Sequence, residues 1–284
     1  MRRVAIKIAY DGGAFHGQVR QPGLRTVEGE VIHALRRARV IRDPKEARFQ
    51  SASRTDRGVS ALGNVVAFDT SLAPDAAARA LNAKSRGVWA WAATEVPEDF
   101  NARRARSRWY RYTLTLAHSV DALNAVLRLF EGEHDFRNFT RDRTRTRTRI
   151  DLARATKEDD SVAIDFMAPS FRWNLVRRIV AAAQRVESGG ATVPDIQAAL
   201  SQPEKIDFGL APPEPLTLMD VEYDERFEAV RDPTTVQRVD SILTEQRRIA
   251  EFLMRLHEKF PGGGRVSPSR DRDDRTFEKR DFSA

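Results

Sequence analysis

The run Ser51-Ala52-Ser53-Arg54-Thr55-Asp56-Arg57-Gly58-Val59 is the stretch around which the rest of the chain is organised. In an extended backbone, residues two positions apart point to the same face. Arg54 and Asp56 are therefore expected to emerge side by side, with Thr55 turned away. Gly58 then permits a sharp turn, because glycine adopts positive φ without steric cost. The run predicts a turn that presents a carboxylate and a guanidinium together.

Two interpretations of the Arg54/Asp56 pair follow from this pattern. A carboxylate beside a guanidinium stays ionised, since a nearby opposite charge favours the charged form, and this makes Asp56 a candidate nucleophile. The alternative is an ordinary structural ion pair at the end of a strand. An isolated Arg-x-Asp leaves both interpretations open.

The composition favours a polyanionic partner and limits the available chemistry. Among 284 residues, 48 Lys and Arg outnumber 41 Asp and Glu, which gives a net charge of +7 and favours nucleic acid as a partner. The absence of cysteine excludes disulfides, cysteine-bound metal clusters and cysteine nucleophiles. The 5 histidines show no metal-ligand spacing, so no metal is expected.

The sequence also gives an expectation about location. The N-terminus lacks the hydrophobic segment of a signal peptide, and no apolar run approaches the roughly 18 residues that a membrane helix needs. We expect a cytoplasmic protein without membrane contact.

Hydrophobic periodicity predicts strands and helices without regular βαβ alternation, which is typical of an α+β fold. The first strand alternates in the way of a strand with one buried face, and Thr26 is the expected N-cap of the first helix. The first half is predicted to contain strands at 4–10, 64–70 and 88–96, helices at 27–38 and 76–83, and an irregular loop at 14–22. The second half is predicted to contain strands at 108–116, 150–155, 162–167 and 216–223, and helices at 121–130, 171–186 and 194–200.

Two residues of the second half are further candidates for a site. Tyr110 lies near the start of the strand 108–116, where it is either part of the core or placed to stack on a base. Arg177 lies at the border of the apolar stripe of the helix 171–186. It is either a side chain that extends from the edge of the core into solvent, or a cation held inward to pair with a carboxylate.

Arginine recurs at every second position in the run Arg141-Asp142-Arg143-Thr144-Arg145-Thr146-Arg147-Thr148-Arg149. If the run is extended, its arginines share one face and form a track for phosphates, with threonines opposite. The alternative is a solvated loop.

The chain is long enough for one large or two ordinary domains. We expect an N-terminal α+β half at 1–104 that carries Asp56 and a C-terminal α+β half at 105–230. A helix is expected at 231–260, followed by a disordered basic tail at 261–284 that is rich in Gly, Pro, Ser and mixed charge.

Taken together, these segments resemble the TruA family of tRNA pseudouridine synthases. The run 53–59 is similar to the family's catalytic motif Gly-Arg-Thr-Asp-Ala-Gly-Val. Tyr10-Asp11-Gly12, Phe15-His16-Gly17 and Arg20-Gln21-Pro22 are similar to its opening strand and loop. Further matches follow in the family's order at 99–103, 110–112, 132–136, 171–180, 211–213 and 216–223, so that the resemblance covers residues 3–224.

The resemblance implies a fold, an activity and partners. The fold would be two ferredoxin-like (RRM-like) halves that share a mostly antiparallel sheet, with a central catalytic cleft between them and a C-terminal helix beyond. The activity would be isomerisation of uridine to pseudouridine in the anticodon arm of tRNA, at positions 38 to 40. The enzyme would be a homodimer and would need no cofactor, since the reaction involves no redox change or group transfer. A noncatalytic RNA-binding protein on the same scaffold is the alternative.

The resemblance also assigns roles to individual residues. Asp56 would be the catalytic aspartate, acting as nucleophile or as base, with Arg177 as its basic partner. Tyr110 would pack on the target base, and Arg54 would occupy the space left by the extruded nucleotide.

The sequence departs from the bacterial pattern of the family at three places. Gln18-Val19 stands where Trp-Gln is usual, Ser60 replaces a histidine, and Trp173-Asn174 replaces a His-His pair. None of these changes removes a catalytic group, but residues at the rim select the RNA, so they bear on which uridines are modified.

Overall fold

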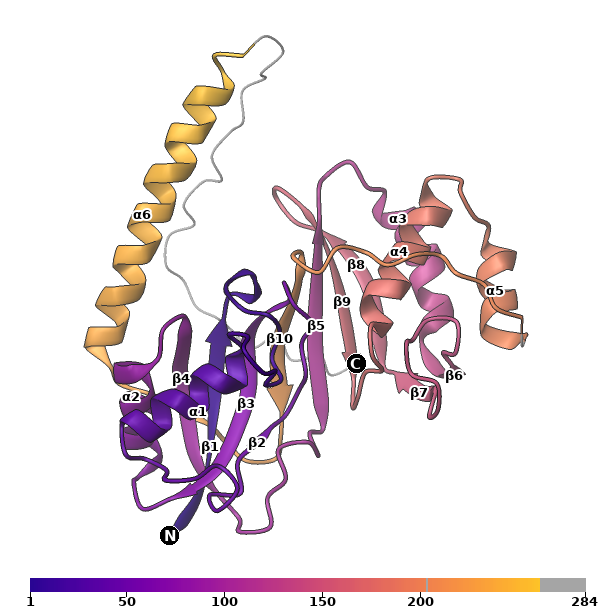
Figure 1. Ribbon diagram of the computed structural model, residues 1–284. Helices are drawn as coiled ribbons and strands as arrows, with labels where there is room; N and C mark the ends of the chain where they lie inside the picture. Colours follow the sequence, from indigo (N-terminus) through magenta and orange to yellow (C-terminus); the bar gives the residue numbers. More distant parts are fainter. Residues whose placement is uncertain (203, 261–284) are drawn as a thin grey trace. The chain divides into compact units, whose positions relative to one another are not determined.

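A large, mostly antiparallel sheet organises the first of the two units into which the chain divides, Met1–Asp232 (Figure 1). The computed structural model describes residues 1–202 and 204–260, and over these residues the sheet has nine strands. Eight follow the order β11-β4-β1-β3-β10-β5-β9-β8, and β2 pairs with β3. The strands are β1 Arg2–Tyr10, β2 Gln50–Ser51, β3 Ser60–Thr70, β4 Val88–Val96, β5 Ser107–Leu114, β8 Leu152–Lys157, β9 Val162–Ala168, β10 Leu216–Glu222 and β11 Glu228–Ala229.

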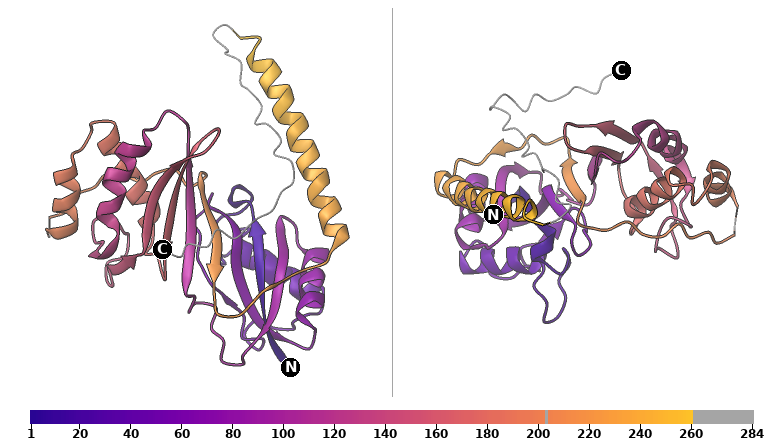
Figure 2. Two further views of the ribbon diagram at one scale, coloured as in Figure 1. Left: turned by 180° about the vertical axis from the view of Figure 1, so that it is seen from behind. Right: turned by 90° about the horizontal axis from the view of Figure 1, so that it is seen from above.

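The helices of this unit fall into two groups (Figure 2). One group packs α1 against α2, and α2 contacts β4 and β1; the other packs α3 against α4, and α3 contacts β8. A separate two-stranded sheet pairs β6 with β7. Their bounds are η1 Gly12–Ala14, α1 Val27–Arg37, α2 Pro74–Lys84, α3 Val120–Leu127, η2 Arg128–Phe130, β6 Gly132–Asp135, β7 Arg147–Ile150, α4 Leu175–Glu187 and α5 Val193–Ser201. The α+β class predicted from the sequence is confirmed.

Strands β4, β1 and β3 from the first half of the chain meet β10, β5, β9 and β8 from the second half where β3 lies beside β10. This is a short parallel contact in which Thr217 pairs with Ser60 and Leu218 with Ala61. β2 pairs with the other end of β3, through Gln50 and Ser51. The segment 52–59 therefore connects β2 to β3 at the point where β10 begins to pair with β3.

Local sequence signals account for most of the element boundaries. The Thr26 side chain accepts a hydrogen bond from the Gly29 N–H and caps α1, as predicted. Pro74 lies at the first position of α2, where its missing N–H is not needed. In β5 the predicted alternation is confirmed, since Tyr110, Tyr112 and Leu114 are buried on one face.

Strand β1 is buried on both faces, whereas its alternation predicted one buried face. Ile6 and Ile8 are fully buried, and so is Ala5 on the other side. The second face includes Lys7, whose ammonium group pairs with Asp220 and lies over the rings of Trp91 and Phe227. The hydrocarbon stem of a lysine is apolar, so a paired lysine is compatible with a covered face.

Helix α4 begins four residues later than the periodicity predicted. The prediction placed its start at residue 171, but the helix runs over Leu175–Glu187. Asn174 precedes it with φ of 65°, in the left-handed region that asparagine tolerates better than most residues. The segment 171–174 is therefore a loop, and it contributes to the site described below.

The arginine run at 141–149 is not one continuous extended strand. Only Arg147–Ile150 form a strand, β7, and Arg145 has φ of 56°, which breaks the alternation. Its arginines are nevertheless all exposed. They are distributed over a loop and a strand start, and they do not lie on the single flat face that strict alternation would produce.

The second unit contains helix α6, Pro233–His257. The predicted helix at the C-terminal end is confirmed, and its apolar residues are exposed, among them Leu253 (54%) and Phe252 (60%). The predicted disordered tail at 261–284 lies outside the described residues. None of the helices within the described ranges has the length and apolar character needed to cross a bilayer.

Candidate active site

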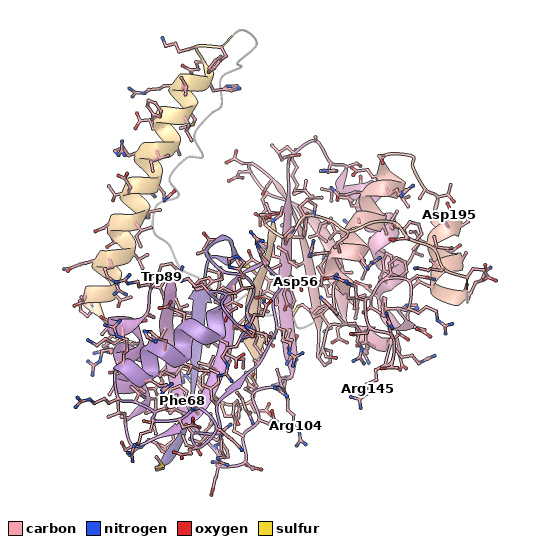
Figure 3. All side chains as sticks on the ribbon, viewed as in Figure 1. Asp56, Phe68, Trp89, Arg104, Arg145 and Asp195 are labelled. Carbon is pink, nitrogen blue, oxygen red and sulfur yellow. The ribbon has the colours of Figure 1, made fainter. Side chains whose placement is uncertain are left out.

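Asp56 lies in the turn between β2 and β3, and Figure 3 places it near the middle of the first unit. The Val59 N–H donates to the Asp56 carbonyl (3.1 Å), and Gly58 has φ of +87°, which explains why glycine follows the aspartate. Gly12 approaches the same turn so closely that a Cβ there would lie 2.3 Å from the Val59 carbonyl oxygen. The turn is thus pressed against η1, and a side chain at Gly12 would displace it.

A buried hydrogen-bond network fixes the chain on the N-terminal side of Asp56. The Asn64 amide donates to the Tyr10 hydroxyl (3.1 Å) and to the Ser53 carbonyl (3.0 Å), and its oxygen accepts from the Ser53 N–H (3.2 Å). The Tyr10 and Thr55 hydroxyl groups are 2.9 Å apart. Burial raises the pKa of Tyr10 to about 12, so this hydroxyl stays protonated. The network holds the residues on both sides of Arg54.

Arg108 connects this network to the second half of the sheet. Its Nε donates to the Ser53 hydroxyl (2.9 Å), and its Nη2 donates to the carbonyl oxygens of Ala52 (3.1 Å) and Arg103 (3.0 Å). Only 7% of Arg108 is exposed. The alternation of β5 carries a signal for this role, because Arg108 lies two residues before Tyr110 and shares its buried face.

The Asp56 carboxylate is held by donors from the second half of the chain. Arg177 Nη1 lies 3.1 Å from Asp56 Oδ2, and the indole Nε1 of Trp173 lies 3.2 Å from Oδ1. The side chain of Arg177 is 11% exposed and that of Asp56 is 31% exposed. Arg177 is therefore held inward and paired, while the carboxylate remains accessible to a ligand.

A strap at 211–213 keeps Arg177 in this position. Arg177 Nε donates to the Ala211 carbonyl (2.7 Å), and the Ala211 N–H donates to the Arg177 carbonyl (3.2 Å). The Tyr112 hydroxyl donates to the Pro212 carbonyl (3.1 Å), and burial raises the pKa of Tyr112 to about 12. The strap thus joins helix α4 to strand β5 beside the Asp56 turn.

Arg54 is exposed, and the part of the chain that the structure describes offers it no hydrogen-bond or ion-pair partner. Thr55 is buried between Arg54 and the partly exposed Asp56, so the two charged residues point outward as the extended pattern predicted. They do not pair with each other, because the cation bound to Asp56 is Arg177. Arg54 is available to an incoming ligand.

Tyr110 is a buried residue of strand β5. It is 7% exposed and packs edge-on against Phe171, with ring centroids 5.1 Å apart and an interplanar angle of 83°. Burial raises the pKa of Tyr110 far above its usual range, so its hydroxyl stays protonated. Tyr110 is therefore a core residue, and its contact with Phe171 joins it to the segment 171–174 that carries Trp173.

These residues form a site suited to covalent or acid–base chemistry on a ligand that approaches from solvent. The Asp56 carboxylate is held in place by Arg177, and Arg54, two residues earlier, adds an exposed cation without a partner among the described residues. Over the described ranges, no three His, Asp or Glu residues come close enough together to hold a metal ion.

Sequence comparisons with known proteins all indicate one family. A family model described as "tRNA pseudouridine synthase" matches residues 126–224. The "tRNA pseudouridine synthase A" of Thermococcus sibiricus is 42% identical over 257 residues, which cover 87% of this chain and 94% of that protein. The proteins of the same name from Pyrococcus abyssi and Methanosarcina barkeri are 43% and 39% identical, covering 78% and 87% of this chain and 85% and 93% of theirs.

Proposed function

The chain belongs to the tRNA pseudouridine synthase A family, and on that premise we propose that Asp56 catalyses the isomerisation of uridine in the anticodon arm of tRNA. As a member of this family the protein is an isomerase that acts on tRNA. The proposed targets are the uridines at positions 38 to 40. The observation that carries the proposal is the pair between Asp56 and the largely buried Arg177 side chain, 3.1 Å apart.

The chemistry of the reaction explains why a fixed carboxylate is needed. The bond from N1 of uracil to C1′ of ribose breaks, the base rotates, and C5 forms a new bond to C1′. The proton on C5 is lost and N1 gains one, so no oxidant, reductant or group donor is consumed. In these steps Asp56 acts as a nucleophile or as the base that removes a ribose proton. Arg177, 3.1 Å from its Oδ2, holds the carboxylate in place for either role.

The target base must leave the RNA stack before Asp56 reaches it. Extrusion costs a few kcal/mol, which new stacking and backbone contacts must offset. Arg54, which is exposed and has no partner in the described part of the chain, is two residues from Asp56 and is placed to enter the space that the nucleotide leaves. Tyr110, whose ring packs edge-on against Phe171, would stack on the extruded base.

The activity can be tested with tRNA transcripts labelled with tritium at C5 of uridine. Because C5 exchanges its hydrogen for C1′, each turnover is expected to release one tritium into water. A purified protein that binds the transcript but releases no tritium would be a noncatalytic RNA-binding protein, and the proposal would be wrong.

Two substitutions of Tyr110 distinguish stacking on the base from a purely structural role. Tyr110→Phe keeps the ring that packs on Phe171, so it is expected to fold and to bind tRNA as the wild type does. Tyr110→Ala is expected to lose roughly 1 to 3 kcal/mol of base stacking, and its rate of tritium release should fall accordingly. Thermal melting of both variants shows whether the loss comes from unfolding. Wild-type activity in Tyr110→Ala would leave Tyr110 a core residue only.

The arginine run at 141–149 is proposed to bind the tRNA backbone, since Arg143 and Arg145 are exposed cations. Changing Arg143, Arg145 and Arg147 to glutamine is expected to reduce the number of counterions released on tRNA binding by up to about three. The slope of log K against log salt becomes correspondingly flatter. The same number of charges removed from the exposed Arg36, Arg37 and Arg39 at the end of α1 is a matched control. If both triple variants flatten the slope equally, or if the Arg143/Arg145/Arg147 variant keeps the wild-type slope, the run is only solvated.

We infer further that the first unit consists of two ferredoxin-like halves, 1–104 and 105–230, with the catalytic cleft between them. Each half has the element order β-α-β-β-α-β when the short elements η1, η2 and β11 and the additions β6, β7 and α5 are set aside. The strand orders β4-β1-β3-β2 and β10-β5-β9-β8 are equivalent, which supports the same inference. The helix at 231–260 lies outside both halves.

We also propose that the enzyme acts in the cytoplasm as a homodimer. A tRNA extends well beyond a site built from about 230 residues, and a second subunit would hold its distal part; closed twofold symmetry is the commonest oligomeric arrangement. The exposed apolar side chains of α6 are one candidate surface for the contact. Light scattering on a size-exclusion column is expected to give about twice the monomer mass of 32.2 kDa. A monomeric mass with full activity would contradict the dimer.

A further inference from the structure

The Asp56 carboxylate has two donors, and the second of them has no assigned role. Arg177 Nη1 donates to Oδ2 at 3.1 Å, and the indole Nε1 of Trp173 donates to Oδ1 at 3.2 Å. With Arg177 alone, the carboxylate keeps the broad torsional freedom of an sp³–sp² bond. A donor on the other oxygen fixes the plane of the group.

The main chain of Trp173 is held on both sides by the segment that begins the arginine run. The Trp173 carbonyl accepts from the Thr140 hydroxyl (3.0 Å) and from the Arg141 N–H (3.1 Å). The Trp173 N–H donates to the Asp142 carboxylate (3.2 Å). These contacts place the indole over the Asp56 turn, even though Trp173 precedes helix α4 and lies in a loop.

The indole ring is also held by a cation. The guanidinium carbon of Arg141 lies 4.5 Å from the centroid of the Trp173 ring. This stacking restricts the ring while 51% of the residue remains exposed. An exposed tryptophan contributes less to the core than a buried one, so its removal is expected to cost little stability.

We propose that Trp173 is a positioning residue for the reaction: its indole N–H sets the orientation of the Asp56 carboxylate, and Arg141 holds the indole in place. This inference rests on the proposed catalytic role of Asp56. Orientation of a catalytic group acts on the reaction step more than on binding, because the RNA is held mainly through its phosphates and shape.

The test compares Trp173→Phe with Trp173→His in the full-length protein, by tritium release from C5-labelled tRNA. Phenylalanine keeps a ring for Arg141 but has no N–H, and kcat is expected to fall about tenfold or more with KM within about twofold. Histidine restores a ring N–H, so Trp173→His is expected to recover most of the lost kcat. Arg141→Gln removes the stacking partner and should lower kcat by a smaller factor.

Trp91→Phe is the matched control. Trp91 is a 44% exposed tryptophan whose indole N–H also donates to an oxygen, the Leu62 carbonyl (2.6 Å), and a cation lies over its ring as well. Neither of these contacts involves the Asp56 turn, so wild-type kcat is the expected result. Melting temperatures of all variants identify any loss that comes from unfolding.

Three results would overturn the inference: wild-type kcat in Trp173→Phe, a change in KM alone, or a Trp173→His variant as slow as Trp173→Phe. Asp56→Asn is measured beside them to separate this inference from the proposed function. An active Asp56→Asn would refute the catalytic role of Asp56 itself. An inactive Asp56→Asn together with a fully active Trp173→Phe would refute the role of Trp173 only.

Discussion

Asp56→Asn is expected to abolish pseudouridine formation while the affinity for tRNA stays within a few-fold of wild type. Asparagine has nearly the same shape and still accepts a hydrogen bond from Trp173, but it carries no charge and is neither a nucleophile nor a base. Binding is expected to persist because it depends mainly on phosphates and on the shape of the RNA. Tritium release and a filter-binding titration on the same preparation measure the two effects separately.

Glu214→Gln is the control for this substitution. Glu214 is an exposed carboxylate beside the same turn, since a Cβ built at Gly58 would lie 3.2 Å from its Oε1. It has no ion-pair partner among the described residues, so its neutralisation is expected to leave turnover unchanged. If Asp56→Asn and Glu214→Gln lose turnover equally, the effect comes from the charge of this surface and not from Asp56 itself.

Arg177→Gln is expected to lower turnover by roughly 30- to 1,000-fold, which corresponds to about 2 to 4 kcal/mol lost when a partly buried charge pair loses one partner. Two contacts disappear: the pair with Asp56 at 3.1 Å and the hydrogen bond to the Ala211 carbonyl at 2.7 Å. Arg177→Lys keeps the charge, but lysine lacks the planar guanidinium that makes both contacts at once. An intermediate rate is therefore expected.

The adjacent arginine provides a matched control on the same helix. Arg178 is 19% exposed and pairs with Asp207 at 3.0 Å, away from the Asp56 turn. Arg178→Gln is therefore expected to keep near-wild-type turnover. Similar losses in Arg177→Gln and Arg178→Gln would mean that helix α4 is merely destabilised, and would contradict the role of Arg177.

Most of the fold was predictable because its signals are local. Alternation in β5, the Thr26 cap of α1 and the proline at the start of α2 each act within a few residues. The burial of β1 on both faces was not predictable, since it depends on Asp220 and Phe227, which are far away in the sequence. The start of α4 was misplaced because an apolar stripe does not reveal where an asparagine adopts positive φ.

The site was predictable only in part. The pairing of Asp56 with Arg177 joins residues 121 positions apart, and the family resemblance supplied it where spacing could not. Asn64 and Arg108, both buried polar residues on strands, were visible in the pattern but were not recognised. Trp173 gave no physical signal at all, because its contact with Asp56 depends on the loop geometry before α4.

The most direct test maps pseudouridine in an unmodified tRNA transcript with a pseudouridine-specific carbodiimide, after incubation with the wild type and with Asp56→Asn. The expected result is modification by the wild type at one or more of positions 38 to 40 and none by the variant. Modification by Asp56→Asn, or wild-type modification only outside the anticodon arm, would contradict the proposal.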